Sequence, residues 1–137
     1  MTSTLSDDDY IALAAFRYAL RKFLRFSKRY LSEKAELTPE QYEVLLALKA
    51  SSPEEGFLVG ELSERLQVEH HSAVSLTDKL AARNLVTKQR GLVDRRHVLV
   101  KLTSAGSDLL ATLARGHRDE IRTHSSEMID ALKRLQG

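Results

Sequence analysis

Residues 61–103 constrain the fold of this chain more than any other stretch, because their apolar pattern changes from helical to strand-like partway along. The first part repeats at the i, i+3, i+4, i+7 spacing of one helical face, and the second part has short apolar runs at 85–86 and 98–100. The pattern predicts a short helix, a tight turn, a second helix and two strands joined by a loop. The positions expected to face the core from the second helix are Ala73, Leu76, Thr77 and Leu80.

The end of this stretch is strongly basic. Between Lys79 and Lys101 there are seven cationic side chains and one acid, Asp94. Two paired strands joined by a basic loop would carry cations at the tip of a hairpin, where they can neutralise DNA phosphates. Helix, turn, helix and hairpin form the layout of a winged helix-turn-helix. We therefore expect a mainly α-helical chain with a small β-hairpin wing that binds DNA.

The composition limits the class of protein. A length of 137 residues and a hydrophobic fraction of 42% suit one domain, which we take to span 1–137. A net charge of +2 is too small to indicate nucleic-acid binding by itself, so the local clustering of charge carries that argument. The absence of cysteine excludes disulfides, thiolate metal ligands and thiol redox sensing.

No segment of the sequence predicts export or membrane insertion. The stretch MTSTLSDDDY is acidic and lacks the charged-then-apolar design of a signal peptide. No apolar run approaches the roughly 18 residues of a membrane span. We expect a soluble, cytoplasmic protein with no membrane partner.

Both ends of the chain are predicted to be helical. Residues 7–31 contain no proline or glycine and carry a wide apolar band, which needs a second covering surface that another subunit could supply. A helix capped by Thr103 can break within the polar cluster at 123–126. We expect the helices at about 7–34 and 104–135 to form a two-fold dimer interface.

Two short signals locate the elements between these ends. Thr38 as N-cap, Pro39 at the first helical position and Gln41 placed to close a capping box predict the start of a helix. Residues 57–58 predict a minimal strand that pairs with the later hairpin. The DNA-binding winged helix is thus expected at about 37–103.

The second helix of the helix-turn-helix is expected to enter the major groove of DNA, whose width of ~12 Å admits one helix. Its outer side carries groups that can donate or accept at base edges, and Val74 could meet a thymine methyl or be an ordinary surface aliphatic. The residues expected to contact bases are His70, His71, Val74 and Ser75. The residues expected to contact phosphates are Ser72, Lys79, Lys88 and Arg90.

A collinear series of short motifs runs through the chain. It comprises Leu37-Thr38, Glu61-Leu62-Ser63-Glu64-Arg65-Leu66, Leu76-Thr77-Asp78-Lys79-Leu80, Asn84-Leu85-Val86, Asp94-Arg95-Arg96 and Val98-Leu99-Val100-Lys101-Leu102-Thr103. In this order and spacing the chain resembles the MarR family of winged helix-turn-helix transcriptional regulators over nearly its whole length. The resemblance implies a homodimer on a near-palindromic double-stranded DNA operator, and we interpret the protein as a repressor.

The resemblance also assigns roles in the wing. It places Arg95 at or near the tip, reaching the minor groove, whose negative potential favours an arginine. It implies that Asp94 and Arg96 stabilise the loop or engage phosphate. Glu69 stands where the family often has a small hydroxyl residue, and the pair His70-His71 is unusual in the family. The base preference is therefore expected to be particular to this chain.

Many members of the family respond to small, often aromatic, anions bound between the dimerisation and DNA-binding regions. The resemblance therefore implies a cleft for an effector that releases the protein from DNA, although the sequence does not identify the compound. No cofactor is expected. The residues we expect around the effector are Phe16, Tyr18, Arg21 and Tyr42.

Two other interpretations are compatible with the sequence. His117, Glu120, His124 and Glu127 would share one face of an unbroken helix, and such a set could hold zinc or manganese in a metal-responsive regulator. A winged helix can also act as a protein-interaction module without DNA, which the basic hairpin argues against. An enzyme is not expected, because the histidines have no nucleophile or paired carboxylate at a recognisable spacing.

Overall fold

The fold is described from a computed structural model that covers residues 4–51, 56–91 and 97–137. These residues form two compact units, which are described separately. The terminal unit consists of the chain up to Tyr30 and the chain from Arg115 onward, and the central unit consists of 31–114. The helices α1 (Asp7–Ala35) and α5 (Ser104–His124) each contribute residues to both units.

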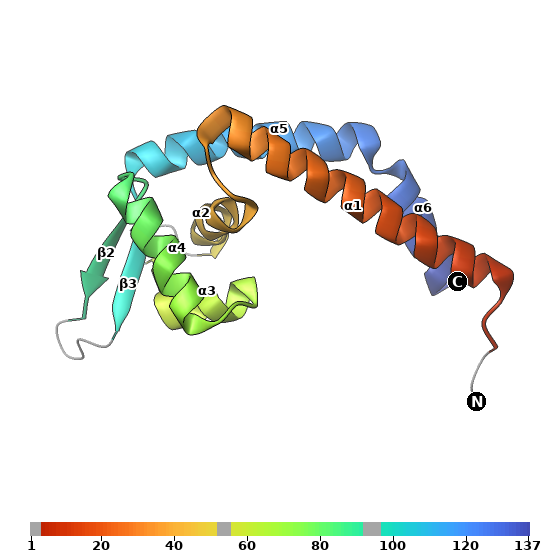
Figure 1. The fold of residues 1–137 in the computed structure, drawn as a ribbon, viewed down its shortest axis with the longest axis horizontal. Coiled ribbons are helices and arrows are strands. Elements are labelled where there is room, and N and C mark those ends of the chain that lie inside the picture. The colour runs from red at the N-terminus through yellow and green to blue at the C-terminus, as the bar shows by residue number, and fades with distance from the viewer. Residues whose placement is uncertain (1–3, 52–55, 92–96) are drawn as a thin grey trace. The chain divides into compact units, whose positions relative to one another are not determined.

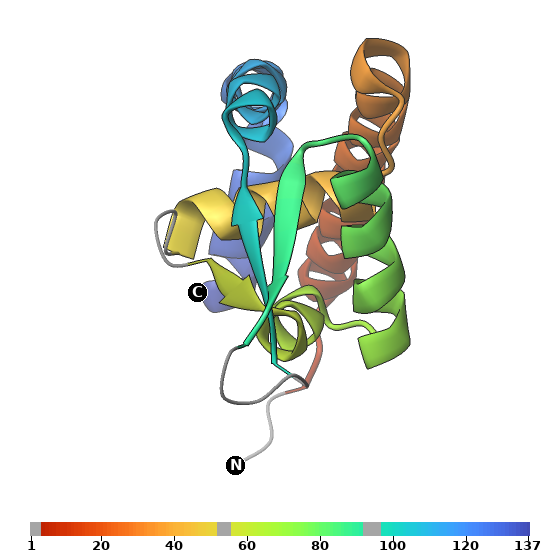
Figure 2. The ribbon, with the colours of Figure 1, turned by 90° about the vertical axis from the view of Figure 1, so that its left-hand side faces the viewer.

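The central unit contains the helix-turn-helix and the sheet. Its elements are α2 (Pro39–Ser51), β1 (Phe57–Leu58), α3 (Val59–Leu66), α4 (His70–Ala82), β2 (Val86–Arg90) and β3 (Val98–Leu102). The sheet is antiparallel in the order β1-β3-β2, and α4 lies beside β2 (Figure 2). Phe57 pairs with Val100, and Lys88 pairs with Val100 from the other side. The expected mainly helical fold with a small β-hairpin is therefore confirmed.

Local signals account for where these elements begin and end. The Thr38 backbone N–H donates to Gln41 Oε1 at 2.9 Å, and the Gln41 N–H donates to Thr38 Oγ1 at 3.2 Å, which is the predicted capping box. The helix α3 ends at Leu66, and its C-cap residue Gln67 has a left-handed φ of 57° that terminates the helical hydrogen bonding. The turn between α3 and α4 is thus fixed by backbone conformation, and α4 begins at His70.

The hairpin is joined to α5 by a close backbone contact. Thr103 Oγ1 donates to the Asn84 carbonyl at 2.7 Å and accepts from the Gly106 N–H at 2.9 Å, so one hydroxyl caps α5 and holds the start of β2. A side chain at Gly106 would collide with the Leu85 carbonyl. Glycine is therefore required where the first turn of α5 crosses the chain entering the hairpin.

The terminal unit is built from the N-terminal part of α1, the end of α5 and α6 (Ser126–Gln136). Along its length α6 lies beside α1 (Figure 1), with ion pairs of 3.2 Å joining Asp8 to Arg134 and Lys22 to Glu127. The predicted break of the last helix is confirmed, because α5 ends at His124 and α6 starts two residues later. Among the residues that the structure describes, no helix is long and apolar enough to cross a membrane.

Candidate DNA-binding surface

The orientation of α4 is set by the side that it buries. Ala73, Thr77 and Leu80 are each 0% exposed, and Thr77 Oγ1 donates to the Val74 carbonyl at 3.0 Å, which satisfies the buried hydroxyl. Leu76, the fourth expected core position, is half-buried. With this side in the core, the opposite side of α4 is held outward.

The outer side of α4 carries two stripes of residues four positions apart. The groove-facing stripe consists of His70, Val74 and Asp78, which line a groove between α4 and the sheet. The solvent-facing stripe consists of His71, Ser75 and Lys79, which are all exposed. Because residues i and i+4 lie one above the other on a helix, each stripe presents a continuous row of side chains.

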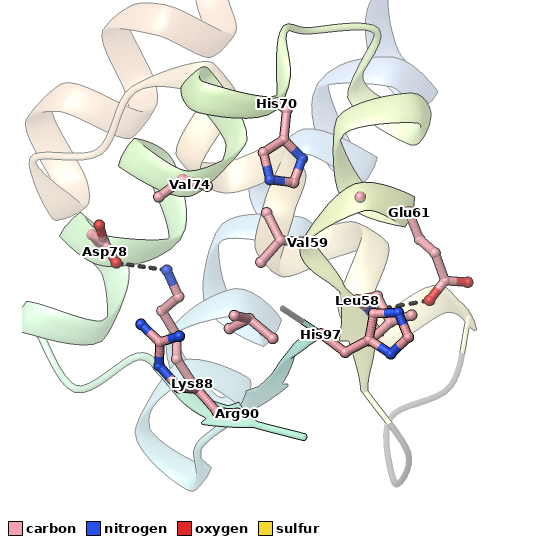
Figure 3. Close-up of a pocket in the computed structure, with 11 residues that line it drawn as sticks. Leu58, Val59, Glu61, His70, Val74, Asp78, Lys88, Arg90 and His97 are labelled. Atoms are coloured by element: carbon pink, nitrogen blue, oxygen red, sulfur yellow. Dashed lines mark hydrogen bonds and ion pairs between the residues drawn. The ribbon is translucent and has the colours of Figure 1, made fainter. Parts of the chain in front are cut away.

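The groove has a volume of about 800 Å³ and is shown in Figure 3. One wall is the groove-facing stripe of α4, and the opposite wall carries side chains from the hairpin and from the start of α3. Two histidines and two cations therefore face the same space. The residues that line it outside α4 are Leu58, Val59, Gly60, Glu61, Lys88, Arg90, His97 and Val98.

The strand β2 alternates between the two faces of the sheet. Residues Lys88 and Arg90 line the groove, whereas Thr87 and Gln89 do not. Lys88 Nζ lies 2.6 Å from Asp78 Oδ1, and the Lys88 side chain is only 19% exposed. Lys88 therefore extends across the groove to α4, as Figure 3 shows, and does not project into solvent.

A second cation fixes the C-terminal end of α4. The guanidinium of Arg83, the residue after α4, donates to the carbonyls of Ala35 and Glu36 at 2.7 Å and 3.1 Å. These carbonyls belong to the end of α1, where helical carbonyls have no intrahelical partner and carry the negative end of the helix dipole. Arg83 thus attaches the end of α4, the predicted recognition helix of the helix-turn-helix, to the end of α1.

The other predicted contact residues have different surroundings. Ser72 is half-buried in a polar hollow at the α3–α4 turn that Glu64 and Glu69 also line, so two carboxylates lie near it. Arg90 is exposed at the end of β2. The wing residues Asp94, Arg95 and Arg96 lie outside the described residues.

Elsewhere in the central unit, the pKa of Glu43 is raised, first by burial and second by the negative charge of the neighbouring Glu40. Glu43 is not part of the groove.

The expected effector residues are divided between the two units. Phe16, Tyr18 and Arg21 are on the part of α1 that belongs to the terminal unit, and Tyr42 is a buried residue of α2 in the central unit. Tyr18 is exposed, and Lys22 Nζ lies 4.5 Å from its ring centroid. The terminal unit also has a mostly apolar cavity of about 410 Å³, lined by Ala19, Leu20, Lys22, Phe23, Glu120, Ile121, His124, Ser125 and Met128. None of the four expected residues lines this cavity.

The structure does not assemble the alternative metal site. His117 is buried beside Ser27, with 2.8 Å between His117 Nε2 and Ser27 Oγ, and its ring packs edge-on against Phe23, Phe26 and Tyr30. His124 Nδ1 lies 2.8 Å from Glu120 on the exposed side, and the helix is interrupted at Ser125. Throughout the described ranges, no group of three or more His, Asp or Glu side chains is placed to hold a metal ion. The alternative metal set requires an unbroken helix with His117 on its polar side, whereas the helix ends at His124 and His117 is buried.

Sequence reasoning missed three residues of this surface. The sequence patterns predict no partner for Asp78 and no specific role for Arg83, which is one of the seven cations between Lys79 and Lys101. His97 was not considered, although it immediately precedes β3. One signal for the Asp78–Lys88 ion pair was available in the sequence. The acid Asp78 on the helix and the base Lys88 on the following strand are ten residues apart.

The recognition helix, the turn before it and the three-stranded sheet define the central unit as a winged helix-turn-helix. Comparisons with known proteins agree with this class. The sequence profile of the MarR family matches residues 35–97. Over these residues the chain is similar to the MarR family, and solved structures of MarR family transcriptional regulators share its fold. A comparison with curated protein sequences gives no significant match.

Solved structures share the fold at low sequence identity. AbsC, a MarR family transcriptional regulator from Streptomyces coelicolor, is 22% identical with a TM-score of 0.76, covering 90% of this chain and 82% of AbsC. Sco3205, a MarR family transcriptional regulator from the same organism solved with DNA, is 18% identical with a TM-score of 0.79, covering 99% and 88%. A variant of MepR from S. aureus bound to an oligodeoxyribonucleotide is 22% identical with a TM-score of 0.66, covering 81% and 79%.

Proposed function

We propose that the chain binds a near-palindromic DNA operator as a homodimer and represses transcription until an effector releases it. The observation that carries the proposal is the solvent-facing stripe of α4, in which His71, Ser75 and Lys79 are exposed beside a basic hairpin. A helix whose opposite side is buried in the core can enter the major groove without rearrangement. Two structures with the same fold, those of Sco3205 and the MepR variant, contain DNA.

Within this proposal the stripes of α4 have separate roles. His71 and Ser75 read base edges, because both side chains are exposed and both can donate and accept hydrogen bonds. His70 and Val74 line the groove, where His70 is exposed and Val74 is half-buried, and they contact bases at its rim. Lys79 and Arg90 neutralise phosphates, while the carboxylates near Ser72 make it a weaker phosphate ligand. Arg95 reaches the minor groove, with Asp94 and Arg96 supporting the wing.

The homodimer is proposed from the surface of the terminal unit. Among its described residues, nine large apolar side chains are 42–60% exposed, and exposed apolar side chains of this kind can form a protein–protein contact. A second copy of the same helices is a self-complementary cover for such a face. The nine residues are Leu5, Tyr10, Ile11, Leu13, Tyr18, Leu24, Ile121, Ile129 and Leu132.

The effector is proposed to be a small aromatic anion. Phe16, Tyr18 and Arg21 offer aromatic surface and a cation, which suits a small aromatic anion, and Tyr42 is the fourth residue of the proposed set. A thermal-shift screen of small aromatic carboxylates would detect such a ligand, and competition with bound DNA would show whether it releases the operator.

Recovery of genomic fragments bound by the purified chain tests the DNA-binding function. We expect one or a few near-palindromic sites and a logarithm of affinity that falls linearly with the logarithm of salt concentration, because phosphate contacts release counterions. Half-sites separated by about one helical turn, roughly 34–36 Å, are expected for a two-fold dimer. Retention of unrelated fragments with equal affinity would contradict sequence-specific binding.

A further inference from the structure

Lys88 has the charge of a phosphate contact, but its position does not suit that role. Its ammonium group lies 2.6 Å from the Asp78 carboxylate, and its side chain is 19% exposed, whereas Asp78 is 62% exposed. A lysine that contacted phosphate from here would first have to leave its carboxylate partner. It would also have to extend out of the groove, whose lining includes the apolar Val74 and Val98.

The ion pair joins α4 to β2, two elements whose relative position must stay fixed for DNA recognition. Asp78 lies on the groove-facing stripe of α4, one turn after Val74, and Lys88 lies in the middle of β2, opposite the fully buried Val100 of β3. Because β2 is hydrogen-bonded along its length to β3, Lys88 projects from a firmly held backbone position. The ion pair therefore bridges the recognition helix and the base of the wing.

The two ends of α4 are otherwise held unequally. Its C-terminal end is attached to the carbonyls of Ala35 and Glu36 by Arg83, while its N-cap residue Glu69 makes no side-chain capping hydrogen bond. The Asp78–Lys88 pair lies between these ends and on the side that faces the hairpin. Rotation of α4 about its axis would separate the pair, so the pair opposes that rotation.

We propose that Lys88 and Asp78 are positioning residues that set the rotation of α4 about its axis. This rotation determines how the His71 and Ser75 side chains meet the bases. In this role Lys88 does not contact phosphate. This inference rests on the proposed DNA-binding function. The pair acts on specificity, because a small rotation of the helix moves every residue of the solvent-facing stripe relative to the base edges. It acts little on the general attraction to DNA, which depends on the number of phosphates neutralised.

The test uses near-isosteric variants of the full-length protein on its recovered operator and on a scrambled duplex. Lys88→Met and Asp78→Asn should each lower the ratio of specific to scrambled affinity by about tenfold, similar to the removal of one base contact. The salt slope should be the same as that of the parent. The matched control Lys79→Met, at a proposed phosphate ligand on α4, should reduce the slope by about 0.9 for each phosphate that is no longer neutralised, or about 1.8 for a dimer.

A charge exchange completes the test. The double variant Asp78→Lys with Lys88→Asp restores the pair with the charges reversed, so its specificity ratio should recover toward that of the parent, while each single charge reversal should not. Lys88→Met reducing the salt slope as Lys79→Met does would overturn the positioning role and make Lys88 a phosphate ligand. Unchanged specificity in Lys88→Met would overturn it as well. A parent protein with no preference for any duplex would instead contradict the DNA-binding function on which this inference rests.

Discussion

In the central unit the large apolar side chains point inward, and Leu62, Leu80 and Val100 are each 0% exposed. Within the described residues of that unit, Leu46 is the one large apolar side chain that is exposed, at 41%. The terminal unit, by comparison, leaves nine such side chains open to solvent over the part that the structure describes. The central unit thus completes its own core, whereas the terminal unit has the exposed apolar side chains from which the homodimer is proposed.

This contrast separates two requirements for function. The central unit must keep α4 in one orientation, which a closed core and the Arg83 and Lys88 contacts achieve within one chain. In the proposed homodimer, the terminal unit must bring two recognition helices to the spacing of two half-sites. Substitutions in the two units are therefore expected to fail in different ways.

The largest effect on stability is expected in the core of the central unit. Leu80→Ala removes a fully buried side chain, so the free energy of unfolding should fall by about 2–5 kcal/mol. Urea denaturation at one fixed protein concentration measures this change. Leu46→Ala, the control on the exposed side of the same unit, should change stability by less than about 0.5 kcal/mol. Equal reductions in the two variants would contradict the assignment of the core.

The next effect is expected on assembly. Ile11 is 60% exposed on α1, and Ile11→Glu should place a charge in the proposed dimer interface. Sedimentation velocity should show a monomer, and operator affinity should fall by about 100-fold because the two half-sites are no longer bound together. Leu46→Glu makes the same chemical change in the central unit and should remain dimeric. An Ile11→Glu protein that sediments as a dimer would exclude this face of α1 from the interface.

A smaller effect is expected from the hydrogen bond buried inside the terminal unit. Ser27→Ala removes the hydroxyl 2.8 Å from His117 and should lower the free energy of unfolding by about 1 kcal/mol. Ser32→Ala, an exposed serine further along α1, is the control and should have no measurable effect. If the two variants had the same denaturation midpoint, the Ser27–His117 contact would not contribute to stability.

Local sequence signals predicted much of the fold. The capping box of Thr38 and Gln41, the minimal strand at Phe57–Leu58 and the break after His124 each depend on a few adjacent residues, and the structure contains all three. The phase of α4 was also predictable, because its buried positions repeat with the helical period.

The partners of charged side chains were not predictable in the same way. Whether Lys88 meets phosphate or Asp78 depends on which face of β2 it occupies and on how α4 is rotated against that face, and neither is encoded locally. The burial of His117 could not be predicted for the same reason. The helical spacing places His117 on a polar stripe of α5, but it does not show that three aromatic rings pack against this residue. The contacts assigned to Arg95 and to the effector residues remain predictions.

The most direct test of the central claim is the base preference of His71→Ala and Ser75→Ala, measured by selection from a randomised operator half-site. Because both residues lie on the solvent-facing stripe of α4, each variant should lose preference at one or two base pairs, by about 1–3 kcal/mol per contact, and keep the preference elsewhere. The salt slope should be the same as that of the parent, since neither residue neutralises phosphate. Base preferences identical to the parent in both variants would show that this face of α4 does not read the DNA.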